Sequence, residues 1–162
     1  MSLLLRKYSH DDLPDMLLIW NSVVEEGIFF PQKESLDMKS AQLFFAEQSY
    51  TSVAVDNGEV VGLYILHPNS IGRCGHIANA SYAVKTGQRG KHIGEQLVKH
   101  SIMTAASLAF RILQFNAVVA TNKGAIHLYE KLGFKALGTI PGGFKMDDGT
   151  YQDIIPFYIS VI

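Results

Sequence analysis

Apolar residues recur every three or four positions in four segments of the chain, which is the spacing of one helix face. The clearest of these predicted helices is 93–109, and the others are 9–26, about 35–48 and 121–132. Ser, Asp, Thr or Asn residues at the start of the last three can cap a helix, and glycines follow 26 and 132. The side chains expected on the buried faces are Leu13, Met16, Leu17, Trp20, Val23, Val24, Leu43, Phe44, Ala46, Leu97, Val98, Ile102, Ala105, Leu108 and Ala109.

Short segments that are continuously apolar or alternate in polarity predict strands. Residues 56–58, Asp-Asn-Gly, are a strong signal for a hairpin turn between two of them. Glycines and a proline at 141–143, together with Asp148 and Gly149, are expected to connect the last two strands. The predicted strands are 3–8, 51–55, 59–66, 76–84, 112–120, 135–140 and 151–161.

The predicted elements follow the order β-α-α-β-β-β-α-β-α-β-β. Such an order favours an α/β or α+β domain in which helices cover both faces of a mixed sheet. The sequence contains no linker, repeat or low-complexity tract, so one domain spanning 1–162 is the expected organisation.

Composition narrows the class further. Apolar residues make up 48% and charged residues 18% of the 162 residues, which supplies a packed core and excludes general disorder. Lys and Arg total 14 against 15 for Asp and Glu, so the net charge of −1 disfavours nucleic-acid binding. No apolar stretch resembles a membrane span or a signal peptide. A single cysteine, Cys74, indicates a reducing compartment, and a cytoplasmic location is expected.

The segment that carries chemistry is a glycine-bearing loop between a predicted strand and the longest predicted helix. Its glycines are Gly87, Gly90 and Gly94, and Arg89 and Lys91 add positive charge. Backbone N–H groups of such a loop and the helix N-terminus can together bind a phosphate or pyrophosphate. The spacings of the P-loop and of the dinucleotide-binding fold are absent. The glycines alone leave an ordinary strand-to-helix turn open.

Two separated motifs resemble those of the GNAT (GCN5-related) N-acetyltransferases. Residues 88–94 resemble the family's acetyl-CoA pyrophosphate loop, in which Gln or Arg is followed by two residues, Gly, one residue, and Gly or Ala. In the register that starts at Arg89, His92 stands where the family has its first glycine and Gly94 matches the second. Residues 122–134 resemble the family's later helix, with Asn, Ala, Tyr and Gly-Phe at the usual intervals.

This resemblance implies a three-layer αβα GNAT fold with a mixed, mostly antiparallel central sheet, and direct acetyl transfer from acetyl-CoA to an amine. A backbone N–H near 83–85 would polarise the thioester carbonyl. Tyr129 lies seven residues after Asn122, on the same helix face, and would protonate the departing thiolate; a packed core tyrosine is the alternative. The implied cofactor-binding residues are Ala83, Val84, Arg89, Gly90, Lys91, His92, Ile93, Gly94, Asn122, Ala125 and Tyr129.

A narrower resemblance points to the acceptor. Asn79, Asn116 and Asn122 match three asparagines of fungal acetyltransferases that act on azetidine-2-carboxylate and proline-related imino acids. The first two are expected on adjacent strands, with their amides converging beside the thioester to hold the acceptor or a water. Together with Tyr129 they are the expected catalytic residues. The sequence departs from those fungal proteins at Tyr129, where they carry tryptophan, and it is shorter than they are.

Other readings stay open at this point. A peptide or protein N-acetyltransferase, and a non-catalytic sensor that binds acyl-CoA, would carry the same motifs. Cys74 and His76 could form a nucleophilic pair, although no third orienting group accompanies them. The six histidines lack the spacing of a metal site, so none is expected. The expected partner is a small-molecule amine, and the resemblance also allows a homodimer.

Overall fold

The computed structural model describes residues 2–88 and 90–162. Two short 3₁₀ turns, His10–Asp12 and Gly72–Cys74, accompany the helices and strands. In chain order the elements are β1 (Leu3–Lys7), α1 (Leu13–Glu26), α2 (Met38–Ala46), β2 (Tyr50–Asp56), β3 (Glu59–Pro68), β4 (Ile77–Val84), α3 (Ile93–Ser107), β5 (Ile112–Val119), α4 (Lys123–Lys131), β6 (Lys135–Ala136), β7 (Ile140–Lys145) and β8 (Tyr151–Ser160).

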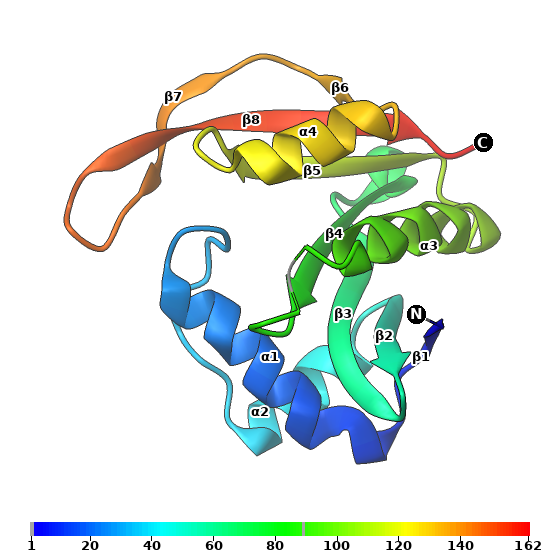
Figure 1. Cartoon of the computed structure of the whole chain (residues 1–162). Coiled ribbons are helices and arrows are strands. Elements are labelled where there is room, and N and C mark those ends of the chain that lie inside the picture. The colour runs from blue at the N-terminus through cyan, green and yellow to red at the C-terminus, as the bar shows by residue number, and fades with distance from the viewer. Residues whose placement is uncertain (1, 89) are drawn as a thin grey trace.

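All of these strands join one mixed sheet, in the order β1-β2-β3-β4-β5-β8-β6, and β7 pairs with β8 (Figure 1). Neighbouring strands are antiparallel except β4 and β5, which are parallel. In the described part of the chain, β4 and β5 pair only at Ile77–Ile112 and Ala78–Leu113, and then diverge. The sheet therefore opens in its middle, between β4 and β5. The predicted glycine-bearing loop follows β4, and the predicted later helix follows β5.

Helices cover both faces of the sheet, as the order of predicted elements indicated. One apolar core lies between the sheet and α1 and α2, with the fully buried Trp20 at its centre. The other lies between the sheet and α3, and the partly buried side chains of α4 pack against it. Residues of β4 alternate between the two cores, since Ala78 and Ala80 face the α3 side and Ala83 faces the α1 side. The three-layer, mostly antiparallel GNAT-like fold is confirmed.

Some helix predictions were wrong in detail. In α2 the buried residues are Ala41 and Phe45, one turn apart, whereas the predicted Leu43 is 59% exposed. The reason is tertiary, because Ala41 and Phe45 are buried in the core shared with α1, where the rings of Phe44 and Phe45 lie 5.1 and 5.9 Å from the Trp20 indole. The predicted stripe of 93–109 also runs too far, since α3 ends at Ser107. The two apolar residues that follow, 108 and 109, are exposed.

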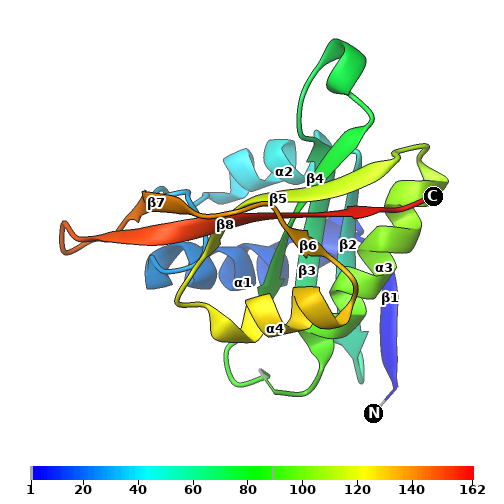
Figure 2. The ribbon, with the colours of Figure 1, turned by 90° about the horizontal axis from the view of Figure 1, so that it is seen from above.

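The C-terminal strands also differ from the prediction. The segment expected as one strand, 135–140, is split into β6 and the start of β7, and the predicted connection 141–143 lies inside β7. The register with β8 shifts between Ile140 and Phe144, which marks a bulge. Gly143 permits it, because a Cβ there would lie 2.4 Å from the Ile154 side chain. The β7–β8 hairpin consequently extends beyond the rest of the sheet, over the end of α1 (Figures 1 and 2).

Candidate active site

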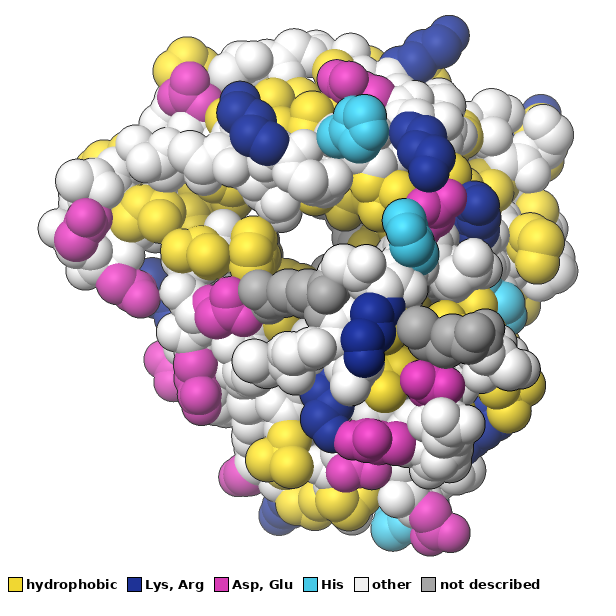
Figure 3. All heavy atoms as spheres, in the orientation of Figure 1, with side chains coloured by type: hydrophobic (Ala, Val, Ile, Leu, Met, Phe, Trp, Pro, Cys, Tyr) yellow, Lys and Arg dark blue, Asp and Glu magenta, His cyan; other side chains and the backbone are white. Residues whose placement is uncertain are grey.

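A cleft of about 830 Å³ occupies the place where β4 and β5 diverge. Its walls come from β4, the N-terminus of α3, β5, α4 and the segment after α1. In the space-filling view a hollow lies in this region, rimmed by hydrophobic side chains (Figure 3). The cleft is large enough for a substantial fraction of a cofactor-sized ligand. Divergence of two strands therefore produces the principal concave site.

The open edge of β4 offers backbone groups to a ligand. Beyond Ala78, β4 has no pairing with β5 among the described residues, so its backbone on that side can bond an extended ligand as a further strand would. Val84 lines the cleft. The Ala83 side chain does not, because it is 1% exposed and packs in the α1 core. Only the Ala83 backbone is left for the predicted cofactor contact.

The glycine-bearing loop leads from β4 to the N-terminus of α3. Gln88, Gly90, His92, Ile93 and Gly94 line the cleft at this end. The predicted Arg89 lies outside the described residues. The predicted Lys91 is exposed, and its Nζ donates a 2.9 Å hydrogen bond to Oε1 of the neighbouring glutamine. The start of this 15-residue helix supplies unpaired N–H groups and a positive dipole end, which suit a pyrophosphate.

His92 explains how the loop tolerates the departure from the family glycine. Its backbone has φ 61°, ψ 19°, the left-handed conformation that favours glycine. Its side chain is 77% exposed and turns toward Glu95, with Nδ1 3.5 Å from a carboxylate oxygen. The chain thus keeps the backbone path of a glycine, with the exposed imidazole turned toward Glu95 in the first turn of α3. The left-handed conformation of a non-glycine residue costs about 1–2 kcal/mol.

Glu95 joins α3 to α4 beside this loop. Its carboxylate accepts hydrogen bonds from Lys99, one turn on, and from Lys131 of α4, at 2.9 and 3.1 Å. These two ammonium groups lower the pKa of Glu95 to about 2. Sequence reasoning missed the cluster, because Glu95 and Lys131 are 36 residues apart. The contact with Lys131 links the first turn of α3 to the last residue of α4.

Helix α4 contributes three predicted residues to the same cleft: Asn122, Ala125 and Tyr129. Asn122 caps the helix, since its Oδ1 accepts a 3.2 Å bond from the Ala125 N–H. The Tyr129 ring packs at 4.6 Å from the Phe115 ring of β5. Burial raises the pKa of the Tyr129 phenol well above its usual value, so the hydroxyl keeps its proton at physiological pH.

The other end of the cleft carries a cluster of side-chain amides. Asn79 of β4 and Asn116 of β5 both donate to Oδ1 of Asn69, at 3.2 and 2.6 Å. Gln114 donates to Asn116 at 3.0 Å. Asn116 lies where the register of β5 with β8 shifts, and its side chain is exposed. The structure therefore brings the two predicted amides together through a residue, Asn69, that sequence reasoning did not select.

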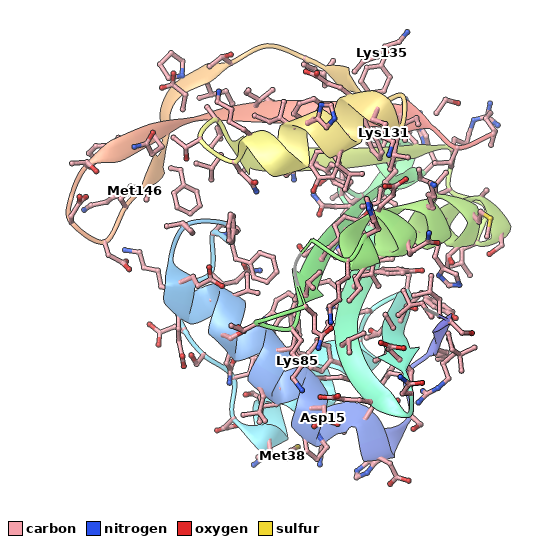
Figure 4. The ribbon with its side chains drawn as sticks, viewed as in Figure 1. Asp15, Met38, Lys85, Lys131, Lys135 and Met146 are labelled. Atoms are coloured by element: carbon pink, nitrogen blue, oxygen red, sulfur yellow. The ribbon has the colours of Figure 1, made fainter. Side chains whose placement is uncertain are left out.

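An apolar wall faces these amides. It consists of Val23 from α1 and of Phe29, Phe30 and Pro31 from the segment after it. The β7–β8 hairpin approaches this segment, as the label on Met146 shows (Figure 4). The hairpin and the wall meet closely, since a Cβ built on Gly27 would lie 2.5 Å from the Asp147 carboxylate. The amide end of the cleft is thus a small space with one polar and one apolar side.

The positions of the remaining candidate residues do not support a cysteine nucleophile in the cleft. Cys74 lies on the exposed turn Gly72–Cys74, outside the residues that line the cleft. No group of three or more metal-ligating side chains occurs among residues 2–88 and 90–162. Within the same described residues, no helix is both long and apolar enough to cross a membrane.

Comparisons with known proteins agree with this arrangement. A family profile described as "Acetyltransferase (GNAT) family" matches residues 16–134. A solved GCN5-related N-acetyltransferase from Kribbella flavida superposes with a TM-score of 0.90 at 32% identity, covering 98% of this chain and 97% of that one. The chain belongs to the GNAT family, and it is an acetyltransferase.

Two curated relatives illustrate the range of similar proteins. N-acetyltransferase aca1 of Schizosaccharomyces pombe is 31% identical over 137 residues, which cover 74% of this chain and 66% of the yeast protein. The chain therefore spans just under two thirds of that relative's length. The L-methionine sulfoximine/L-methionine sulfone acetyltransferase of Pseudomonas aeruginosa is 29% identical over 149 residues, covering 87% of this chain and 85% of the bacterial protein.

Proposed function

We propose that this protein transfers the acetyl group of acetyl-CoA directly to the amine of a small molecule, and that an imino or amino acid is the acceptor class. Acetyl-CoA is the acyl donor that family membership implies. The observation that carries the acceptor proposal is the amide cluster of Asn69, Asn79 and Asn116 at the narrow, partly apolar end of the cleft. The related bacterial enzyme named for methionine sulfoximine also takes a small amine.

The donor site uses the residues at the other end of the cleft. The free edge of β4 at Ala83 and Val84 binds the extended pantetheine portion through backbone hydrogen bonds. Residues 90–94 at the start of α3 bind the pyrophosphate, with Lys91 near by. Asn122, Ala125 and Tyr129 of α4 form the opposite wall. The backbone of His92 supports this role, because its left-handed conformation is the one a glycine would adopt there.

The acceptor site discriminates by polarity and size. Each amide offers two donors and one acceptor, so neighbouring Asn79 and Asn116 can bind a carboxylate or hold an amine. Among the described residues, the charged side chains in the cleft lining, Glu95 and Lys131, belong to α3 and α4, at the donor end. A small acceptor whose carboxylate and nitrogen lie a few ångströms apart suits this arrangement, and its hydrocarbon part can pack on Phe29 and the neighbouring apolar wall.

Chemistry then requires a neutral amine and a stabilised leaving group. An alkyl ammonium with a pKa of about 10.4 is neutral in about one molecule in 2,500 at pH 7, a cost of about 4.6 kcal/mol. Desolvation in the cleft lowers that pKa, because burial disfavours the charged form. At the departing sulfur the protonated Tyr129 phenol donates a hydrogen bond to the developing thiolate.

Acceptor identity is tested by measuring thiol release from acetyl-CoA with a panel of acceptors. We expect saturable release with proline analogues, azetidine-2-carboxylate or small amino acids, and acetylated product of the matching mass. Release with peptides only would replace the proposal by a peptide N-acetyltransferase. Binding of acetyl-CoA with no release for any amine would replace it by a sensor.

The site assignment is tested with Asn79→Ala and Asn116→Ala. Each should lower kcat/KM for the acceptor by about 5–150-fold, which corresponds to about 1–3 kcal/mol for a lost hydrogen bond. The affinity for acetyl-CoA should stay the same in both variants. Loss of acetyl-CoA binding instead would move the two asparagines to the donor site or to the core.

A further inference from the structure

A histidine that sequence analysis left unassigned lies beside the amide cluster. His67 is the penultimate residue of β3, and its register partner on β4 is Asn79. Directly opposed residues of an antiparallel pair point to the same face, with Cβ atoms about 4.5–5.5 Å apart. Both side chains line the cleft. His67 therefore stands at the acceptor end, next to one of the two amides proposed to hold the acceptor.

One hydrogen bond sets the proton distribution on this ring. Nδ1 of His67 lies 3.0 Å from the backbone carbonyl oxygen of Pro68. A carbonyl can only accept, so Nδ1 carries the hydrogen and donates it. In the neutral imidazole Nε2 is then the unprotonated nitrogen, whose lone pair is free to take a proton. The hydrogen bond between the His67 ring and its own strand therefore leaves Nε2 as the nitrogen that can act as a base.

The described side chains around His67 include no charged partner for its ring. The register partner of His67 on β4 is Asn79, a neutral amide that shares the Asn69 Oδ1 acceptor with the amide of Asn116. Residues 29–32, after α1, contribute two phenylalanines, a proline and a glutamine to the lining. The other titratable side chains of the lining lie on β4, α3 and α4: Tyr82, His92, Glu95, His127, Tyr129 and Lys131. No ion pair of His67 occurs among the described residues.

We propose that His67 is the general base of the reaction, with Nε2 accepting the proton of the attacking amine; this rests on the proposed function. As the amine nitrogen forms its bond to the carbonyl carbon, its proton passes to Nε2, directly or through one water. The C–S bond then breaks with its electron pair on sulfur. The thiolate takes up a proton as His67 gives up its own, directly or through solvent, which leaves the amide product, the free thiol and a neutral His67. Asn79 positions the amine, and His67 takes its proton.

The kinetic test compares His67→Gln with a matched control, His76→Gln. His76 has an exposed side chain outside the cleft lining, so its variant should match the wild type. His67→Gln keeps polarity and similar size but cannot titrate. We expect kcat/KM for the acceptor to fall by about 10²–10⁴-fold, the usual contribution of a general base. The dissociation constant for acetyl-CoA and the melting temperature should be unchanged, and the acidic limb of the pH profile of kcat/KM should disappear.

A second variant separates catalysis from structure. Added imidazole should restore part of the activity of His67→Ala in a saturable way, whereas it should not affect His76→Gln. An unchanged kcat/KM and an unchanged acidic limb in His67→Gln would overturn the proposal and leave the proposed function standing. Absence of thiol release from the wild type with every amine would instead overturn the proposed function.

The tautomer gives a readout that needs no activity. In ¹⁵N-labelled protein with acetyl-CoA bound, the neutral His67 ring should show a protonated Nδ1 and an unprotonated Nε2. A proton on Nε2 in that state would remove the base and contradict the inference, whatever the kinetics of the variants.

Discussion

Replacing Asn69 tests whether the amide cluster positions the acceptor. Asn69→Ala removes the Oδ1 that accepts from Asn79 at 3.2 Å and from Asn116 at 2.6 Å. Each such hydrogen bond contributes about 0.5–1.5 kcal/mol, so the two together contribute about 1–3 kcal/mol to the arrangement. Asn116 is exposed and Asn79 half-buried, and water can replace part of what is lost. The expected effect is therefore in the lower half of that range.

A loss of about 1–2 kcal/mol from the two hydrogen bonds lowers kcat/KM for the acceptor by about 5–30-fold. The backbone N–H of Asn69 bonds the Ile77 carbonyl at 2.7 Å, and alanine keeps this bond, so the loop should hold its path. The assay is steady-state thiol release at saturating acetyl-CoA while the acceptor concentration is varied. Ser70→Ala, an exposed neighbour outside the cleft lining, is the matched control.

The proposed role of the amide cluster in positioning the acceptor is refuted if folded Asn69→Ala has the same kcat/KM as Ser70→Ala. It is also refuted if the acetyl-CoA dissociation constant rises and the KM for the acceptor stays the same, because the amides would then serve the donor. Denaturation curves of both variants show whether an altered rate reflects the site or the stability of the chain.

Three further predictions follow from the donor end. Tyr129→Phe should lower kcat by about 10–100-fold with unchanged acetyl-CoA affinity, and an unchanged kcat with chemistry rate-limiting would leave this residue a packing role only. His92→Gly should raise the free energy of unfolding by about 0.5–1 kcal/mol in denaturant titrations, since it relieves a left-handed backbone while adding unfolded-state entropy, and a loss of stability would contradict the strain. Bonds from Lys99 and Lys131 hold the pKa of Glu95 at about 2, so its stabilising effect is full above about pH 4.5 and is lost as the pH falls toward 2. Melting temperatures of Glu95→Gln and wild type should therefore differ at neutral pH and converge in acid, and a difference that persists at pH 2 would refute this.

Local signals in the sequence were sufficient for most of the fold. Asp37 caps α2 and Asn122 caps α4, because capping depends on residues three positions apart. Asn57 and Gly58 adopt positive φ values of 50° and 79° in the predicted hairpin turn. Helical and alternating patterns located the helices and most strands for the same reason. The order of elements then indicated helices on both faces.

Features that depend on contacts between distant segments could not be read in this way. The buried face of α2 depends on the core that it shares with α1, and the bulge in β7 depends on the space beside Ile154. The convergence of Asn79 and Asn116 was predicted from the narrower family resemblance. The role of Asn69 as the acceptor that Asn79 and Asn116 share was not predicted, because the sequence does not show which groups a loop asparagine will bond. For His67, the decisive fact is a ring nitrogen close to a carbonyl, which only coordinates can supply.

Both the proposed reaction and the role of His67 require that acetyl-CoA binds where β4 and β5 diverge, against the start of α3. Titration calorimetry of the wild type and Gly94→Trp with acetyl-CoA tests it directly. Gly94 lines the cleft, and a Cβ there would meet only Val84, at 4.0 Å, so the indole should fill the phosphate site without disturbing the fold. Met103→Trp, on an exposed position of the same helix, is the control. We expect saturable binding for the wild type and the control and none for Gly94→Trp at an unchanged melting temperature. Equal binding by all three proteins, or no binding by the wild type, would contradict this binding site.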